Sequence, residues 1–460
     1  MPDGRAAASP QKRLMSPGAR LRHNQPMPPT VAIDQPRAVA FDILQAVLRQ
    51  RVPLDDLLAG HRDLNSLPSR DRGFVRALVA TALRRLGQID AILAACLERP
   101  LPGRASAIED LLRLGIAQLL FLRVPAHAAV DTTVALVARR GGEAGFKGLV
   151  NAVLRRVDRE REALLAATSR VANLPDWLRW SWVDTYGAEV AAAIGAALAD
   201  EPPLDFTVQG DPAVWASALG AELLPTGSLR RPAELGGPID ELPGFAEGAW
   251  WVQDAAAALP ARLLGDVAGR RVADLCAAPG GKTAQLAAAG AAVLAVDRSA
   301  PRLQKVADNL ARLGLSAELV VADAAQWQPP DPLDAVLLDA PCSSTGTIRR
   351  HPDIAWLKRP ADVAKLAQLQ DRLLLNAVQA LAPSGRLVFC TCSLQPEEGP
   401  ARIAALLAAG APVEREPIAA AEVAGQSELV TAEGDLRTLP CHWPQAGGLD
   451  GFYAARLRRR

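Results

Sequence analysis

The chain has 460 residues, half of them apolar, and this length predicts two or three domains that each bury a core. Its 51 basic and 50 acidic residues leave a net charge of +1, so a nucleic-acid partner has to be argued from local patches. The six cysteines include no pair at zinc-site spacing, so we expect no metal, no disulfides and a reducing, cytoplasmic setting. The longest apolar runs are too short to cross a membrane, and the N-terminus lacks an apolar signal core.

The first two predicted regions are a tail and a helical domain. Residues 1–35 are rich in Pro, Ala and Arg without periodicity, which predicts a disordered basic extension, with an auxiliary RNA-binding arm as the alternative. Residues 36–164 repeat apolar residues at spacings of three and four, as in Val39, Ile43 and Val47, which indicates amphipathic helices. Because no strand-like alternation interrupts them, we expect an all-helical bundle.

The rest of the chain is predicted to be mixed α/β. Residues 165–250, broken by Pro202-Pro203 and several glycines, predict a small α/β linker subdomain. Residues 251–460 alternate short apolar runs with helical patterns, which indicates a parallel, Rossmann-like sheet covered on both faces. Its predicted strands are Arg271–Leu275, Ala292–Val296, Glu318–Val321, Ala335–Leu338 and Arg386–Phe389. Such a sheet binds its ligand at the carboxyl ends of the strands.

A loop of small residues follows the first of these strands and precedes a helix, so its backbone can turn tightly around a bound group. The residues predicted to bind a cofactor here are Cys276, Ala277, Ala278, Pro279, Gly280, Gly281 and Lys282. The end of the loop, Gly281-Lys282-Thr283, also resembles a phosphate-binding P-loop. That motif requires glycine at position 276, where this chain has cysteine, so we discount the P-loop.

Acids end the next two strands. Asp297 can accept both hydroxyls of a ribose, and Asp323 can contact the adenine side of the same nucleoside cofactor. Each acid alone could simply cap the following helix. The occurrence of such residues after three successive strands is a far more specific signal than any one of them.

Two cysteines lie beyond the last two strands. Asp339-Ala340-Pro341-Cys342 follows the fourth strand, and Thr391-Cys392-Ser393 follows the fifth. A single cysteine is usually a small core residue. Two of them beside polar residues at the ligand-binding edge indicate reactive groups. A further cysteine, Cys390, is interpreted as packing.

In these motifs the sequence resembles the RsmB family, also called Sun or Fmu, of bacterial ribosomal RNA cytosine-5 methyltransferases. The bundle resembles NusB-type RNA-binding domains, and the resemblance extends over nearly everything from Arg37 onward. The matching segments of the catalytic part are Cys276–Thr283, Asp339–Gly346, His351–Leu357, Thr391–Ser393 and Gly451–Leu457.

The resemblance implies a cofactor, a substrate and three catalytic residues. S-adenosyl-L-methionine would donate the methyl group, and Cys392 would attack carbon 6 of the cytosine so that carbon 5 becomes nucleophilic. Cys342 would assist release of the product, and Asp339 would hydrogen-bond the base and also line the cofactor site. The expected partner is 16S rRNA or a small-subunit assembly intermediate, bound by a monomeric enzyme.

Two alternatives stay open, namely a tRNA cytosine-5 methyltransferase and a catalytically inert RNA-binding or antitermination factor. The intact loop, Asp339, Cys342 and Cys392 argue against the inert factor. Two local groups of basic residues could neutralise RNA phosphates. One is Arg349, Arg350, His351, Lys358 and Arg359, and the other is Arg139, Arg140, Lys147, Arg155 and Arg156.

Overall fold

The computed structural model describes residues 34–460. The predicted tail of residues 1–35 lies outside the described residues, apart from Asp34 and Gln35 at its end. These two begin the first helix, where the Asp34 carboxylate accepts a hydrogen bond from the backbone N–H of Arg37 (3.3 Å). This cap satisfies one of the free amides in the first turn.

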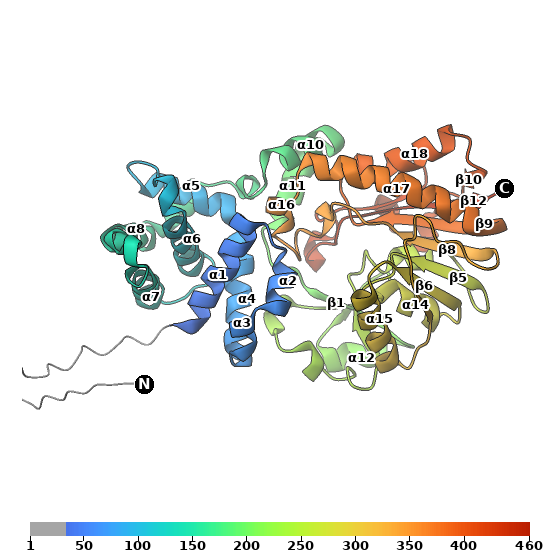
Figure 1. The fold of residues 1–460 in the computed structure, drawn as a ribbon, viewed down its shortest axis with the longest axis horizontal. Coiled ribbons are helices and arrows are strands. Elements are labelled where there is room, and N and C mark those ends of the chain that lie inside the picture. Colours follow the sequence, from blue (N-terminus) through green and yellow to red (C-terminus); the bar gives the residue numbers. More distant parts are fainter. Residues whose placement is uncertain (1–33) are drawn as a thin grey trace, which may run out of the picture.

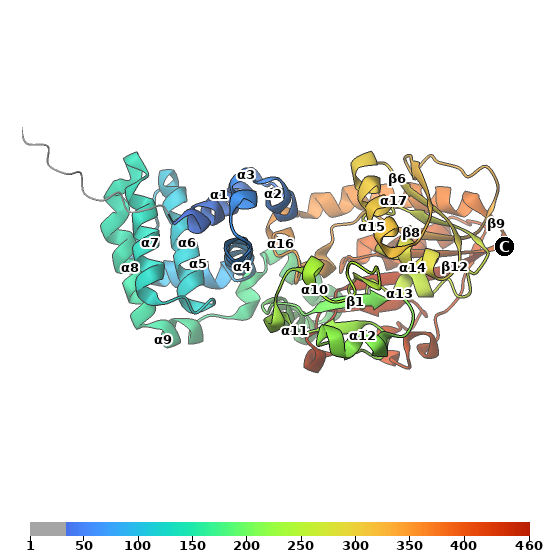
Figure 2. The ribbon, with the colours of Figure 1, turned by 90° about the horizontal axis from the view of Figure 1, so that it is seen from below.

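The first lobe is an all-helical bundle, as predicted (Figures 1 and 2). The apolar positions of its amphipathic helices form one core, in which Ile43, Leu78 and Ile108 are fully buried. Its helices are α1 (Gln35–Gln50), α2 (Leu54–Gly60), α3 (Arg62–Ser66), α4 (Ser69–Arg84), α5 (Leu86–Cys96), α6 (Ser106–Leu120), α7 (Ala126–Ala138), α8 (Lys147–Arg159) and α9 (Arg161–Ala166).

A helix pair and a small antiparallel sheet follow. Helices α10 (Asp176–Tyr186) and α11 (Ala188–Leu198) pack against the C-terminal lobe, where buried Trp182 donates to the side chain of Gln395 (2.8 Å). The sheet has the order β2-β3-β1-β4, with β1 (Leu204–Val208), β2 (Glu222–Leu223), β3 (Leu229–Arg231) and β4 (Trp250–Val252), and carries α12 (Pro212–Leu219). Trp182, Trp250 and Trp251 are buried, so these tryptophans pack in cores.

The C-terminal lobe is built on an eight-stranded sheet. Its strands follow the order β10-β12-β9-β8-β5-β6-β7, and β11 pairs with β12. All five predicted strands are present and parallel, and the C-terminal strands add an antiparallel edge. The strands are β5 (Arg271–Leu275), β6 (Ala292–Asp297), β7 (Glu318–Val321), β8 (Leu333–Asp339), β9 (Leu381–Thr391), β10 (Val413–Arg415), β11 (Leu436–Thr438) and β12 (Phe452–Arg459). The Rossmann-like prediction is confirmed.

Helices cover both faces of this sheet (Figure 1). Helices α17 (Pro360–Ala380) and α18 (Pro400–Ala408) bury apolar side chains against one face. Helices α13 (Leu259–Arg262) and α14 (Gly281–Ala288) bury theirs against the other, with α15 (Ala300–Leu313) packed beside α14. The carboxyl ends of the parallel strands therefore remain free to form a site.

The two lobes meet at the short helix α16 (Ile354–Leu357). The indole N–H of Trp356 donates to the carbonyl of Leu83 in the bundle (2.9 Å), and the Asp353 carboxylate accepts from the backbone N–H of Leu54 (2.9 Å). Trp356 also packs on the core of the bundle. The segment that follows the Cys342 loop is therefore docked onto the N-terminal lobe.

Candidate active site

The predicted cofactor loop joins β5 to α14 and turns sharply. Gly280 has a φ of +100°, and a Cβ atom there would lie 2.8 Å from the side chain of Val306, so only glycine fits. Below the loop, the hydroxyl of Thr283 donates to the buried carboxylate of Asp274 (2.6 Å). This hydrogen bond fastens the first turn of α14 to β5, and burial raises the pKa of Asp274 to about 7.

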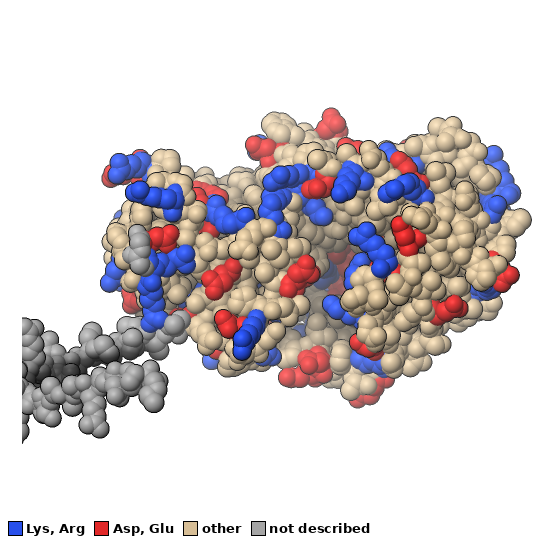
Figure 3. Space-filling model, in the orientation of Figure 1, with Lys and Arg blue, Asp and Glu red and all other residues tan. Residues whose placement is uncertain are grey.

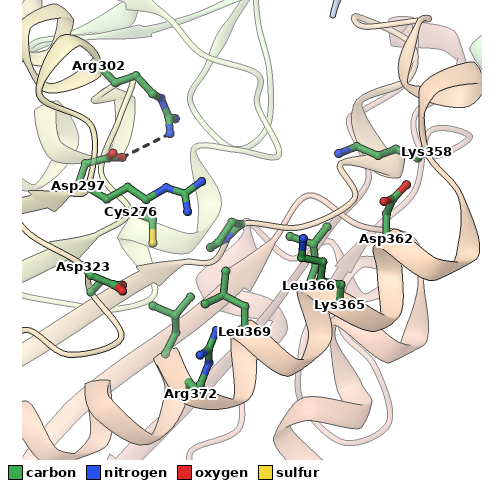
Figure 4. Close-up of a pocket in the computed structure, with 14 residues that line it drawn as sticks. Cys276, Asp297, Arg302, Asp323, Lys358, Asp362, Lys365, Leu366, Leu369 and Arg372 are labelled. Atoms are coloured by element: carbon green, nitrogen blue, oxygen red, sulfur yellow. Dashed lines mark ion pairs between the residues drawn. The ribbon is translucent and has the colours of Figure 1, made fainter. Parts of the chain in front are cut away.

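A cavity of about 500 Å³ opens beside this loop and is drawn in Figure 4. Cys276, Asp297 and Asp323, three of the residues predicted to bind the cofactor, lie on its wall. Asp297 is 2% exposed, and its carboxylate accepts hydrogen bonds from the backbone N–H groups of Ala278 (3.2 Å) and Ser299 (2.9 Å). These contacts fix its position at the end of β6.

The opposite wall of the cavity comes from α17 and the segment before it, which the sequence analysis did not assign to the site. Its residues are Lys358, Asp362, Lys365, Leu366, Leu369, Arg372 and Leu373. Figure 4 shows Asp297 and Asp323 on one side of the opening and Lys358, Asp362 and Lys365 on the other. The cavity has the size of a small-molecule site, and its paired acids suit the hydroxyls and amine of a nucleoside.

The two predicted catalytic cysteines lie side by side. Strands β8 and β9 are parallel neighbours in which Asp339 pairs with Cys390, so their carboxyl ends meet. The Sγ atoms of Cys342 and Cys392 are 3.5 Å apart, and the backbone N–H of Gly346 donates to the carbonyl of Cys392 (2.9 Å). Residues 50 positions apart in the sequence thus form one reactive pair.

The surroundings of the two thiols favour ionisation of Cys392. The hydrogen bond with Cys342 lowers the pKa of Cys392, whereas burial and the charge of Asp339 oppose this, and Ser344 and the charge of Lys282 add to the lowering. The same hydrogen bond, with burial and the charge of Glu398, raises the pKa of Cys342 well above its ordinary value. A thiolate is therefore more accessible at Cys392 than at Cys342.

Asp339 contacts Lys282 and Cys390 and is not among the residues that line the cavity. One of its carboxylate oxygens accepts from the Nζ of Lys282 (2.7 Å), and the other lies 3.5 Å from the Sγ of Cys390. Lys282 thus turns toward β8, although it was predicted to bind the cofactor with the rest of the loop. Cys390 is fully buried in an apolar cluster, in keeping with its interpretation as packing, and it also contacts Asp339.

The predicted basic patch after the Cys342 loop is wrong for Arg349 and Arg350. Arg349 is 2% exposed. Arg350 forms ion pairs with Asp254 and Asp450 and donates to the carbonyl of Pro203 (3.1 Å). A basic residue loses solvent exposure in this way only where acids from distant segments compensate its charge.

Other predicted basic residues do reach the surface. Lys358 lies on the cavity wall, and His351 pairs with Asp55 of the bundle (3.0 Å). In the bundle, Arg155 and Arg156 are exposed and form ion pairs with Asp131 and Glu160. Figure 3 shows that the face is hollowed between the lobes, with both Lys or Arg and Asp or Glu side chains around the hollow.

A Rossmann-like sheet, a nucleoside-sized cavity with Asp297 at the end of the second parallel strand, and a loop of small residues after the first are the features of an S-adenosyl-L-methionine-dependent methyltransferase. The model of the 16S rRNA methyltransferase RsmB/F family matches residues 261–458, and that of the NusB family matches residues 34–159. Two curated relatives, both named ribosomal RNA small subunit methyltransferase B, support this. The protein from Pseudomonas syringae is 40% identical, over 92% of this chain and 96% of its own length. The one from Klebsiella pneumoniae is 36% identical, over 92% and 98%.

The chain therefore belongs to the RsmB/F family of 16S rRNA methyltransferases. Two solved structures share its fold. The protein PH0851 superposes with a TM-score of 0.72 at 22% identity, over 93% of this chain and all of that one. NSun6 from Pyrococcus horikoshii, solved with SFG, superposes with a TM-score of 0.53 at 20% identity, over 62% and 98%. Within residues 34–460 there is no helix long and apolar enough to span a membrane, and no cluster of side chains suited to a metal ion.

Proposed function

We propose that this protein methylates carbon 5 of a cytosine in 16S rRNA through a covalent adduct between Cys392 and carbon 6. The observation that carries the proposal is the pair of sulfur atoms 3.5 Å apart at the ends of β8 and β9, next to the nucleoside-sized cavity. A single thiol would suffice for packing, whereas two adjacent thiols with opposite pKa shifts suit two different steps.

In the proposed reaction the Cys392 thiolate adds to carbon 6 and pushes electrons onto carbon 5. S-adenosyl-L-methionine, when bound, supplies an electrophilic methyl group that carbon 5 takes up. The proton on carbon 5 is then removed by a base, the electron pair restores the double bond between carbons 5 and 6, and Cys392 leaves as a thiolate. Cys342 assists this release, and Asp339 hydrogen-bonds the base ring.

The proposed cofactor and RNA sites lie in different predicted domains of the chain. We propose that Cys276, Asp297 and Asp323 hold the nucleoside part of the cofactor, and that residues 277–282 shape the loop beside it. Residues 36–164 would bind RNA as a NusB-like domain, residues 165–250 would link the lobes, and residues 251–460 would carry out the chemistry as a monomer in the cytoplasm. The names of the relatives, which specify small-subunit ribosomal RNA, support 16S rRNA over tRNA.

Bisulfite sequencing tests the proposal directly, because 5-methylcytosine resists deamination. Unmethylated 16S rRNA, both free and in small-subunit particles, and total tRNA, all from a strain that lacks the gene, are incubated with the purified protein and S-adenosyl-L-methionine. We expect one protected cytosine in 16S rRNA that is absent without cofactor. Protection in tRNA alone would reassign the substrate, and no protection in either RNA would favour the inert factor.

A further inference from the structure

A buried carboxylate that the proposed reaction does not use lies just behind the cysteine pair. Glu398 ends a short 3₁₀ turn, η7 (Pro396–Glu398), that follows β9 and Cys392, and it is fully buried. A buried carboxylate is tolerated only where its oxygens accept hydrogen bonds. The partners of Glu398 therefore show what holds it there.

Those partners are the residues that directly follow the two cysteines. Oε1 of Glu398 accepts from the backbone N–H of Ser343 (2.8 Å), and Oε2 accepts from the hydroxyl groups of Ser393 (2.6 Å) and Ser343. Ser343 and Ser393 are themselves fully buried, and their hydroxyl oxygens lie 3.1 Å apart. One carboxylate thus joins the loop that carries Cys342 to the loop that carries Cys392.

Two further contacts fix the carboxylate against the strands and against α17. The hydroxyl of Thr391 donates to the backbone carbonyl of Glu398 (3.0 Å). The amide of Gln370 on α17 donates to the carbonyl of Pro341 (2.9 Å) and reaches Oε1 of Glu398 (3.4 Å). The Cys342 loop is consequently held on both sides of its cysteine, at Pro341 and at Ser343.

We propose that Glu398 is a positioning residue that holds Cys342 and Cys392 in contact by binding Ser343 and Ser393 at once. It acts through these serines and does not touch the RNA or the cofactor. Hydrogen bonds to a buried carboxylate are stronger and shorter than those between neutral groups, so they can hold two loops in register where a neutral side chain would let them separate. This inference rests on the proposed roles of the two cysteines.

The test compares Glu398→Ala and Glu398→Gln with Glu397→Gln, which changes the exposed neighbour. The first readout is alkylation of Cys392 by iodoacetamide across a pH series, followed by peptide mass spectrometry. The charges of Asp339 and Lys282 also act on the pKa of Cys392, and both residues remain in every variant. Without Glu398 the hydrogen bond from Cys342 is lost, so we expect the alkylation profile to shift to higher pH in Glu398→Ala and to stay in place in Glu397→Gln.

The second readout is adduct formation, with S-adenosyl-L-methionine present, on RNA that contains 5-fluorocytosine. Carbon 5 then carries fluorine in place of the proton that a base would remove, so the adduct persists after methyl transfer. We expect Glu398→Ala to form it about 100-fold more slowly, since a displacement of about 1 Å can cost that much, and to bind S-adenosyl-L-methionine with unchanged affinity. The double variant Ser393→Ala/Glu398→Ala should form the adduct no more slowly than Glu398→Ala alone, because both substitutions break the same hydrogen bond between Ser393 and Glu398. If Glu398→Ala does not fold, Glu398→Gln, which keeps the volume and one acceptor, is used in the same comparisons.

Any of several results would overturn the role of Glu398. They are an unshifted alkylation profile, adduct formation as fast as in Glu397→Gln, and effects of the Ser393 and Glu398 substitutions that multiply. A loss of cofactor affinity as large as the loss of rate would also contradict it, since that would show general damage. If the wild-type protein forms no adduct, the proposed function fails, and the alkylation profile still decides whether Glu398 holds the thiols together.

Discussion

The ammonium group of Lys282 in the cofactor loop lies 2.7 Å from the carboxylate of Asp339 at the end of β8. Lys282 is nearly buried, whereas the Asp339 side chain is 31% exposed. The pair joins the loop after the first strand of the parallel sheet to the residue that precedes the Cys342 loop. The cofactor site and the cysteine site are therefore held to each other by one ion pair.

Lys282→Met should destabilise the fold, because it leaves Asp339 without its partner. Water can reach Asp339, so we expect a loss of about 1–3 kcal/mol in the free energy of unfolding. Burial opposes the charged form of Lys282, but the charge of Asp339 outweighs it and raises the pKa of Lys282. The stabilisation is therefore complete below the ordinary value of 10.5 and declines as the pH rises above it. Urea unfolding at neutral and alkaline pH measures both effects, and equal stability of the two proteins at neutral pH would contradict the prediction.

Asp297→Ala should weaken the binding of S-adenosyl-L-methionine. Loss of hydrogen bonds to a charged acceptor costs about 1.5–3 kcal/mol, which corresponds to about a 10- to 150-fold higher Kd. Asp297→Asn is the matched control, because it keeps the shape and one acceptor oxygen and should lose less. Calorimetric titration measures both variants. Unchanged affinity in Asp297→Ala would remove this residue from the cofactor site.

Substitutions of the two cysteines should have opposite effects on the covalent RNA adduct. Cys392→Ala should abolish both methyl transfer and the covalent RNA adduct, because no thiol attacks carbon 6. Cys342→Ala should accumulate a protein–RNA complex that survives denaturing electrophoresis, because attack proceeds and release stalls. The double variant should form no complex. Trapping by Cys392→Ala instead of Cys342→Ala would mean that the roles are reversed.

Adduct formation should depend on pH through Cys392. The reacting form is the thiolate, so the rate rises with pH until the pKa of Cys392 is passed. Since the hydrogen bond from Cys342 lowers that pKa below its ordinary value, Cys342→Ala should move the rising limb of the profile to higher pH. Single-turnover rates of adduct formation measure this shift. Coincident profiles would show that Cys342 does not influence the nucleophile.

Arg350 and the exposed arginines of α8 should behave differently when they are changed. Arg350→Met removes one member of a largely buried ion-pair group with Asp254 and Asp450, and we expect it to cost about 3–5 kcal/mol of stability. Charge reversal at Arg155 and Arg156 should leave the fold intact, weaken RNA binding and flatten its salt dependence. Chemical unfolding and RNA titration over a salt series separate the two effects. A destabilised α8 variant, or an Arg350 variant as stable as the wild type, would refute this assignment.

The residues at the ends of strands could be predicted from the sequence, because a parallel sheet gathers all its carboxyl ends at one edge. This rule was enough to bring Asp297, Asp323, Asp339, Cys342 and Cys392 to that edge. It could not show that Lys282 would turn toward Asp339, since the direction of a side chain depends on which charge lies nearest in space.

Other parts of the site depend on contacts between distant segments. Arg350 reads as a surface cation because its partners, Asp254 and Asp450, are about a hundred residues away in either direction. The periodicity of α17 indicates that one side of the helix is buried, but not that Lys365 and Arg372 on another side face a cavity. Glu398 carries no sequence signal beyond its neighbourhood to Cys392, because its partners include Ser343 on a different loop.

The docking of Trp356 and Asp353 onto the bundle fixes the distance between the bundle and the Cys342 loop. The segment that leaves the Cys342 loop ends on the N-terminal lobe, so the reactive sulfur atoms and the bundle are separated by a constant length. If the bundle binds RNA as proposed, the RNA that presents a second contact at the matching distance from its cytosine would bind most tightly. The protein would then prefer a folded RNA whose shape spans both lobes to an unfolded strand that contains the same cytosine.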